Sequence, residues 1–178
     1  FNKATSLPSH KAFPRRLGMV VFDVKSMREY MFGQFGLPLF FSVSLWPFKE
    51  LEFSTLYDTA AIFIILLFNL LGLGVFAKLA EHFHDGKAIF LTGALAFATP
   101  VWFYSKAIYP ESIFWVILVG ALYLVLVKRT YWLAGLIMGY AILIKPGYAL
   151  CGVILLVYLA RAANWRRALQ YAVPFMVF

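Results

Sequence analysis

The apolar stretch LYDTAAIFIILLFNLLGLGVFAK, residues 56–78, decides the fold class of this chain. From Thr59 to Ala77 it contains no charged residue. An α-helix rises about 1.5 Å per residue and the hydrocarbon core of a bilayer is about 30 Å thick, so a helix over this stretch is long enough to cross it. We therefore predict a transmembrane helix here.

The rest of the composition agrees with a membrane protein. The 178 residues are 63% hydrophobic and 13% charged, whereas a soluble domain is about half apolar and a quarter charged. Shorter apolar blocks cover residues 88–105, 112–127, 131–144, 147–160 and 168–178. We predict an all-α, polytopic integral membrane bundle with about six membrane segments. Because a 14-residue helix rises only about 21 Å, the shorter blocks must extend into their flanks, or meet a thinned bilayer or a cavity.

The first 55 residues differ from this pattern. Residues 1–35 are mixed and basic, and residues 36–48 form an apolar patch that is too short to span a bilayer. We expect residues 1–55 to be an extracytoplasmic loop with short amphipathic or re-entrant helices, and residues 56–178 to be the transmembrane domain. Phe1 starts in a polar stretch and Phe178 ends an apolar one, so we expect a longer protein at both ends.

The distribution of lysine and arginine predicts the topology. One set of turns carries seven positive charges, at Lys78, Lys87, Lys128, Arg129, Arg161, Arg166 and Arg167. The turns on the other side carry three, at Lys49, Lys106 and Lys145. Positively charged loops stay in the cytoplasm, so the second set is expected outside. The net charge of +8 then faces anionic lipid, and no nucleic-acid partner is predicted.

The turn WFYSKAIYPES, residues 102–112, is unusual because it places charges between two apolar blocks. In one interpretation, Pro110 begins a helix, Glu111 complements the helix dipole and Lys106 reaches toward the membrane surface. In the other, Lys106 and Glu111 line an outward cavity. Lys145, before Pro146, lies on the same side, and two lysines there suit a pyrophosphate or phosphodiester.

Other motifs give weaker evidence of a functional site. His82 and His84 are two residues apart and lie on different helix faces, so no metal site is predicted. Gly135 and Gly139 form a small-xxx-small pattern that permits close helix approach. The sequence has no phosphate-binding loop, dinucleotide fingerprint or nucleophile elbow, and its single Cys151 cannot form an intramolecular disulfide.

Three stretches in the same order together resemble one family. GQFGLPLFFSVSLWPF (33–48) is similar to a GxPLL…P stretch, ATPVWFYSKAIYPESIF (98–114) to an SPxxxYSxxxYPE turn, and YWLAGLIMGYAILIKPGYAL (131–150) to an LAGLxxGxAxLxKP hairpin. These motifs are typical of bacterial membrane glycosyltransferases of the GT-C superfamily, including relatives of the dolichyl-phosphate-mannose protein mannosyltransferases. The resemblance covers residues 33–160.

The resemblance implies a polytopic helical enzyme of the bacterial inner membrane with its active site on the outer face. Its donor would be a polyprenyl-phosphate-linked sugar, transferred with inversion, and a divalent cation is left open as a cofactor. Carried over by matching positions, Tyr109 and Glu111 belong to the site, with Lys106 and Lys145 near the donor phosphate. Cations there would stabilise the charge of the leaving phosphate.

One element of the family pattern is missing. The acidic motif of the family should lie upstream of residues 33–48, and the surroundings of Asp23, VVFDVKS, do not match it. We expect the first helix and the catalytic carboxylate to precede Phe1, so no catalytic residue is assigned here. Two alternatives stay open: a non-catalytic subunit of a larger membrane complex that retains this fold, and a transporter. A transporter would require inverted repeats, which the sequence does not show.

Overall fold

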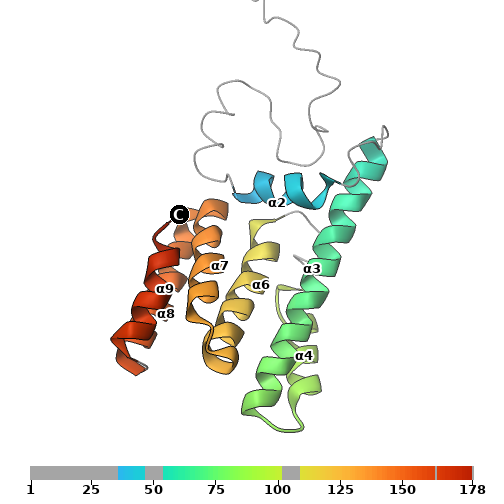
Figure 1. Cartoon of the computed structure of the whole chain (residues 1–178). Helices are drawn as coiled ribbons and strands as arrows, with labels where there is room; N and C mark the ends of the chain where they lie inside the picture. Colours follow the sequence, from blue (N-terminus) through green and yellow to red (C-terminus); the bar gives the residue numbers. More distant parts are fainter. Residues whose placement is uncertain (1–35, 47–53, 102–108, 163, 178) are drawn as a thin grey trace, which may run out of the picture.

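The computed structural model describes residues 36–46, 54–101, 109–162 and 164–177. All regular structure in these ranges is helical, and none of these residues forms a strand. The helices run up and down beside one another, with α2 lying across one end of them (Figure 1). In chain order the elements are α2 (Gly36–Ser44), α3 (Ser54–Phe83), α4 (Ala88–Phe97), α6 (Pro110–Tyr123), the π-helix η2 (Leu124–Lys128), α7 (Tyr131–Ile144), the 3₁₀ turn η3 (Pro146–Tyr148), α8 (Ala149–Ala162) and α9 (Trp165–Phe175).

Two helical segments are long and apolar enough to cross a membrane. They are Thr59–Phe83, of 25 residues, and Pro110–Lys128, of 19 residues, which joins α6 to η2. Helices α4 and α7 and the segment Pro146–Ala162 are apolar but shorter. The described part of the chain is therefore an all-helical bundle with two helices long and apolar enough to span a membrane. The expectation of about six membrane segments stays a prediction.

Two helix boundaries differ from the sequence prediction. Helix α4 ends at Phe97, because Pro100 lacks the N–H that a continuing helix would need; the end of the apolar block, at 105, lies outside the described residues. Helix α9 begins at Trp165 instead of 168, because the side chain of Asn164 accepts a hydrogen bond from the Arg166 backbone N–H at 3.3 Å and caps the helix. Its first two turns are polar on the outer face, where Arg166, Arg167 and Gln170 are exposed.

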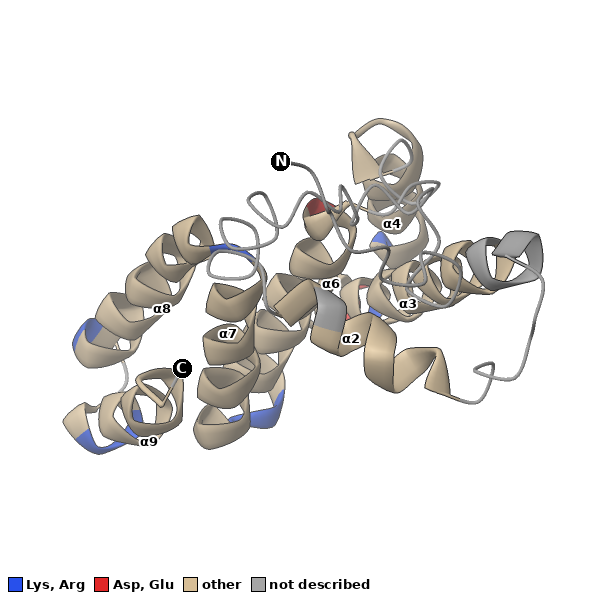
Figure 2. Ribbon diagram, turned by 90° about the horizontal axis from the view of Figure 1, so that it is seen from above, with Lys and Arg blue, Asp and Glu red and all other residues tan. Residues whose placement is uncertain are grey.

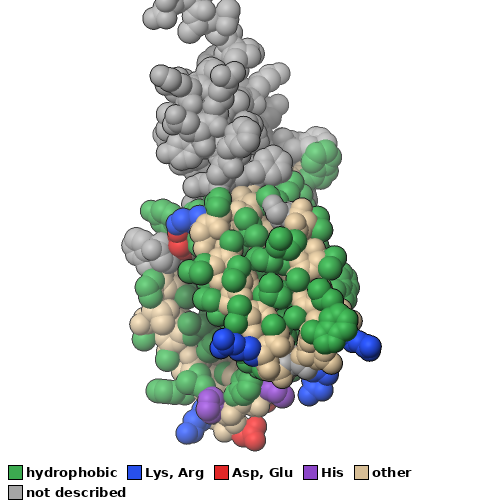
Figure 3. All heavy atoms as spheres, turned by 90° about the vertical axis from the view of Figure 1, so that its left-hand side faces the viewer, with side chains coloured by type: hydrophobic (Ala, Val, Ile, Leu, Met, Phe, Trp, Pro, Cys, Tyr) green, Lys and Arg blue, Asp and Glu red, His purple; other side chains and the backbone are tan. Residues whose placement is uncertain are grey.

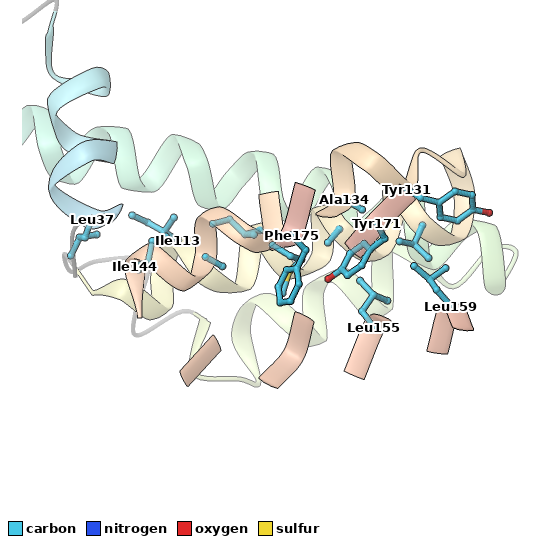
Figure 4. Packing of buried hydrophobic residues seen from close by; sticks show 14 of the residues in the cluster. Leu37, Ile113, Tyr131, Ala134, Ile144, Leu155, Leu159, Tyr171 and Phe175 are labelled. Carbon is cyan, nitrogen blue, oxygen red and sulfur yellow. The ribbon is translucent and has the colours of Figure 1, made fainter. Parts of the chain in front are cut away.

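Helix α9 packs closely against α7 and α8. Gly135 faces Tyr171 so closely that a Cβ at this position would overlap the Tyr171 carbonyl oxygen. The fully buried Tyr171 side chain donates a hydrogen bond from its hydroxyl to the Gly152 carbonyl at 3.1 Å. Figure 4 shows its ring between Ala134 and Leu155. The close helix approach predicted for the small-xxx-small pattern is confirmed at Gly135.

A polar contact joins α3 to α6 within their apolar interface. The Trp115 indole N–H donates to Asn69 Oδ1 at 2.5 Å, and the Asn69 amide donates to the Ile65 carbonyl at 2.7 Å. Asn69 is 2% exposed, so these bonds satisfy a polar group that would otherwise be costly to bury. Gly72 gives the Trp115 ring room against α3. The hydrogen bond between Trp115 and Asn69 therefore fixes the position of α3 relative to α6.

Helix α2 covers the end of the bundle where α6 begins and α7 ends. Leu37, Phe41 and Leu45 recur every four residues and are buried toward the other helices. The Tyr140 hydroxyl donates to the Gly36 carbonyl at 2.6 Å. A Cβ on Gly36 would come within 2.7 Å of the Ile144 backbone nitrogen. Helix α2 is therefore held beside the last turn of α7, next to Lys145.

The two ends of the bundle differ in charge. We call the end that carries α2, Glu111 and Lys145 the α2 end, and the end that carries the turns after α3, η2 and α8 the basic end (Figure 1). In Figure 3, basic side chains gather toward the lower end of the visible face, beneath a broad band of hydrophobic side chains, and one adjacent basic and acidic pair lies near the top. Lys145, the described member of the second set of basic turns, thus lies at the opposite end from the first set, whereas Lys49 and Lys106 lie outside the described residues.

Candidate functional site

The candidate site lies at the α2 end and centres on an ion pair between α6 and α7. Lys145 Nζ donates to Glu111 Oε1 at 3.0 Å. The Lys145 side chain is 49% exposed and the Glu111 side chain 35%, so both remain accessible from this end. An exposed pair of this kind contributes about 1 kcal/mol or less to stability. Lys145 can therefore leave Glu111 and bind another anion with little loss of stability.

The start of α6 places Glu111. Tyr109 is the N-cap residue, with extended backbone angles (φ −110°, ψ 145°), and Pro110 begins the helix. The Tyr109 carbonyl accepts from the Ser112 N–H at 3.0 Å. Proline fits the first helical position because its missing N–H has no partner there. Glu111 then lies in the first turn, where the helix dipole favours a carboxylate. Glu111 therefore both complements the helix dipole and forms the ion pair with Lys145.

The end of α7 places Lys145. Its backbone is extended (φ −156°, ψ 117°), as expected for a residue before proline. Its N–H still bonds to the Ala141 carbonyl at 3.1 Å, and its carbonyl accepts from the Tyr148 N–H at 2.9 Å. The chain therefore leaves the helix at Lys145 and turns at once through η3. This sharp turn directs the Lys145 side chain to Glu111 instead of along α7.

Two aromatic residues complete the site. The rings of Phe114 and Tyr148 stack with centroids 3.6 Å apart and an interplanar angle of 8°. Lys145 Nζ lies 5.7 Å from the centre of the Tyr148 ring, within the range of a cation–π contact. One cation, one carboxylate and a stacked aromatic pair thus meet between α6 and α7.

The structure brings some predicted site residues together and leaves one aside. Glu111 and Lys145 are in direct contact. Tyr109 adjoins Glu111 along the chain and is 43% exposed. Lys106, the second predicted phosphate-binding lysine, lies outside the described residues. Figure 2 views this end from above, with the acidic residue at the start of α6 and a basic residue between α7 and α8.

Phe114 and Tyr148 were missed by the sequence prediction, although a signal exists. Phe114 follows Glu111 by three residues, and Tyr148 follows Lys145 by three. Side chains three apart in a helical turn share a face. An aromatic residue at this spacing after each charge indicates that both charges have an aromatic neighbour on the same side.

The site holds no cluster suited to a metal ion among its described residues. Across the described ranges, no group of three or more His, Cys, Asp or Glu side chains is close enough to share one. Glu111 and its lysine instead form an anion-and-cation pair, which suits recognition of a charged organic group. Comparison of the chain with known protein families, with curated proteins and with solved structures finds no match.

Proposed function

We propose that this chain is part of a GT-C-type membrane glycosyltransferase. It would move a sugar from a polyprenyl-phosphate donor to an acceptor, with inversion, on the outer face of the membrane at the α2 end. The proposal rests on the resemblance of residues 33–160 to that family. The observation that carries it is the contact between Lys145 and Glu111, which joins two of the stretches that bear the resemblance.

Lys145 has the properties required of a donor-phosphate ligand. Its Nζ atom is charged, half exposed and held between α6 and α7 by one carboxylate and one aromatic ring. A phosphate oxygen could replace the Glu111 carboxylate, because an exposed ion pair costs little to break. When the glycosyl bond breaks, the phosphate leaves as an anion, and a fixed cation stabilises the charge that develops on it.

Glu111 and the aromatic pair would serve the same donor. Glu111 holds Lys145 toward the α6–α7 interface. Once a phosphate binds Lys145, the released carboxylate becomes free to accept a hydrogen bond from a sugar hydroxyl. The stacked rings of Phe114 and Tyr148 offer apolar carbon surface for a sugar face or the first isoprene unit. Glu111 is proposed here as an orienting group, not as the catalytic base.

The charge asymmetry supports the proposed topology. Of the eight lysines and arginines among the described residues, seven lie in or beside the turns after α3, η2 and α8, so the basic end would face the cytoplasm. The α2 end, with Tyr109, Glu111 and Lys145, would then face outward. A polyprenyl donor presents its phosphate at the membrane surface, which matches a lysine at the end of a helix.

A non-catalytic subunit with the same fold is the second candidate. One observation favours it: Glu111 and Lys145 form an exposed ion pair with each other, an arrangement that a purely structural role also accounts for. Such a subunit would keep the helices and the ion pair for stability or assembly alone.

Sugar transfer by the protein in its native membrane separates the two candidates. Lys145→Ala should reduce transfer from a polyprenyl-phosphate sugar, because the leaving phosphate loses its cation. Lys87→Ala, which removes an exposed lysine from the opposite end, is the matched control and should leave transfer unchanged. Equal transfer by the wild type and Lys145→Ala would refute the assigned role of Lys145. Absence of transfer in the wild type would favour the non-catalytic subunit.

A further inference from the structure

Five basic side chains lie in or beside the turns after η2 and α8, at the same end of the bundle. They are Lys128, Arg129, Arg161, Arg166 and Arg167, all exposed, and we call them the basic surface. The two turns lie next to each other, because the Arg167 guanidinium lies 5.6 Å from the centre of the Tyr131 ring at the start of α7. The charges of two separate loops are thus combined on one surface.

The basic surface lacks a counter-charge from its own part of the chain. From Ser112 to Phe178 the sequence contains no Asp or Glu. None of the five cations forms a salt bridge with a carboxylate of the described residues. Glu81 and Asp85 belong to the α3–α4 region, which Figure 2 shows on the opposite side of the bundle from α8 and α9. The repulsion between these cations therefore favours an anion from outside the chain.

Aromatic side chains accompany three of the cations. Lys128 lies 5.9 Å from the Tyr123 ring centre, and the Arg166 guanidinium 5.8 Å from that of Trp165. Trp165 itself is 64% exposed. Tryptophan and tyrosine are enriched where a membrane protein meets lipid headgroups. In a lipid headgroup layer, the phosphates would contact these exposed cations. Glycerol or upper acyl carbons would contact the neighbouring rings.

Arg129 adds a second observation. Among the described residues other than glycine, it is the only one in the left-handed region, with φ at 56°, and it ends η2 in this conformation. Helices usually place glycine or asparagine at such a position. Backbone strain of this kind is concentrated at functional sites. The chain keeps an arginine where glycine would fit the backbone better, which points to a use for the side chain.

We propose that the basic surface binds the phosphates of anionic phospholipids in the adjacent leaflet. This inference requires the bundle to lie in a membrane, but it does not depend on sugar transfer. The lipid would be shared by the two turns, so its binding would hold α9 against the start of α7. Loss of the basic surface should therefore weaken the response of the protein to anionic lipid without changing donor binding at the α2 end.

The test measures the unfolding temperature of the purified chain in mixed detergent micelles. Micelles containing phosphatidylglycerol should raise it above the value in matched phosphatidylcholine micelles, and added salt should reduce the difference. Arg166→Gln/Arg167→Gln should remove most of that difference. Lys87→Gln, at the same end but outside the basic surface, is the control and should retain it.

Arg129→Gly keeps the test decisive if the double variant does not fold. Glycine suits the positive φ, so this variant should be at least as stable as the wild type in phosphatidylcholine, yet gain less from phosphatidylglycerol. Equal unfolding temperatures of the wild type in the two lipids would overturn the proposal. So would a full phosphatidylglycerol effect in the variants, or the same increase produced by inorganic phosphate at equal phosphate concentration.

Discussion

Lys145 and Glu111, 34 residues apart in the sequence, are joined by a 3.0 Å contact between Nζ and Oε1. The contact links the end of α7 to the start of α6 at the end of the bundle covered by α2. The surrounding helices are fixed by other, buried interactions. Changes to the pair should therefore affect binding more than folding, which makes the proposed function testable apart from stability.

The ion pair itself should contribute little to the fold. Glu111→Gln and Lys145→Gln should each lower the free energy of unfolding by about 1 kcal/mol or less, because both side chains are partly exposed. Reversible denaturant unfolding in detergent measures this. A loss above about 3 kcal/mol in either variant, the range of a broken buried ion pair, would show that the pair is mainly structural.

The contact between α7 and α9 should not tolerate a side chain. Gly135→Ala places a methyl group against the Tyr171 carbonyl oxygen, and the backbone must shift to make room. We expect a loss of about 1–3 kcal/mol in the free energy of unfolding. The control is Gly93→Ala in α4, where no heavy atom lies within 4 Å of the new Cβ. It should be neutral or gain up to about 1 kcal/mol. Equal effects would contradict the close approach.

The hydrogen bond between α3 and α6 should contribute more to the free energy of unfolding than an average surface contact does. Trp115→Phe removes the indole N–H that Asn69 Oδ1 accepts and leaves a buried acceptor unsatisfied, at a cost of about 1–3 kcal/mol. Trp132→Phe, at a position that is 56% exposed, serves as control and should cost less than about 0.5 kcal/mol. If Trp115→Phe is as mild as the control, the pair does not fix the two helices.

The topology can be read with thiol labelling in intact cells. In a Cys151→Ala background, Gly147→Cys and Arg129→Cys put a single thiol at the α2 end and the basic end respectively. A membrane-impermeant maleimide should label Gly147→Cys directly and Arg129→Cys only after permeabilisation, because basic loops stay in the cytoplasm. The reverse pattern would place the Glu111–Lys145 site on the cytoplasmic side and refute the outward site.

The sequence predicts much of this fold because apolar runs and prolines mark helices directly. The prediction of a helix over residues 131–144 is confirmed by α7 at both bounds. The predicted start of the last helix, at 168, is wrong because of a local hydrogen bond. Asn164 caps α9, so the helix begins at Trp165, ahead of the apolar run. Periodicity alone does not reveal a cap of this kind.

The candidate site was only partly predictable. Charge counting places Glu111 and Lys145 at the same end, because that rule depends on the order of turns along the chain. It does not give their contact, which depends on how α6 packs on α7. The stacking of Phe114 on Tyr148 is likewise a property of two helices together. Both contacts depend on how the helices pack against each other, which the sequence pattern of a single helix does not predict.

The most direct test of the proposed donor site is the affinity for polyprenyl phosphate of the chain reconstituted in lipid nanodiscs. Binding is the suitable measurement because it tests the role of Lys145 independently of the transfer reaction. A charge-assisted hydrogen bond contributes about 1.5–3 kcal/mol, so Lys145→Gln should raise the Kd by about 10-fold or more. Glu111→Gln should leave it unchanged or lower it, since the competing carboxylate is gone. A Kd for Lys145→Gln equal to that of the wild type would contradict the site.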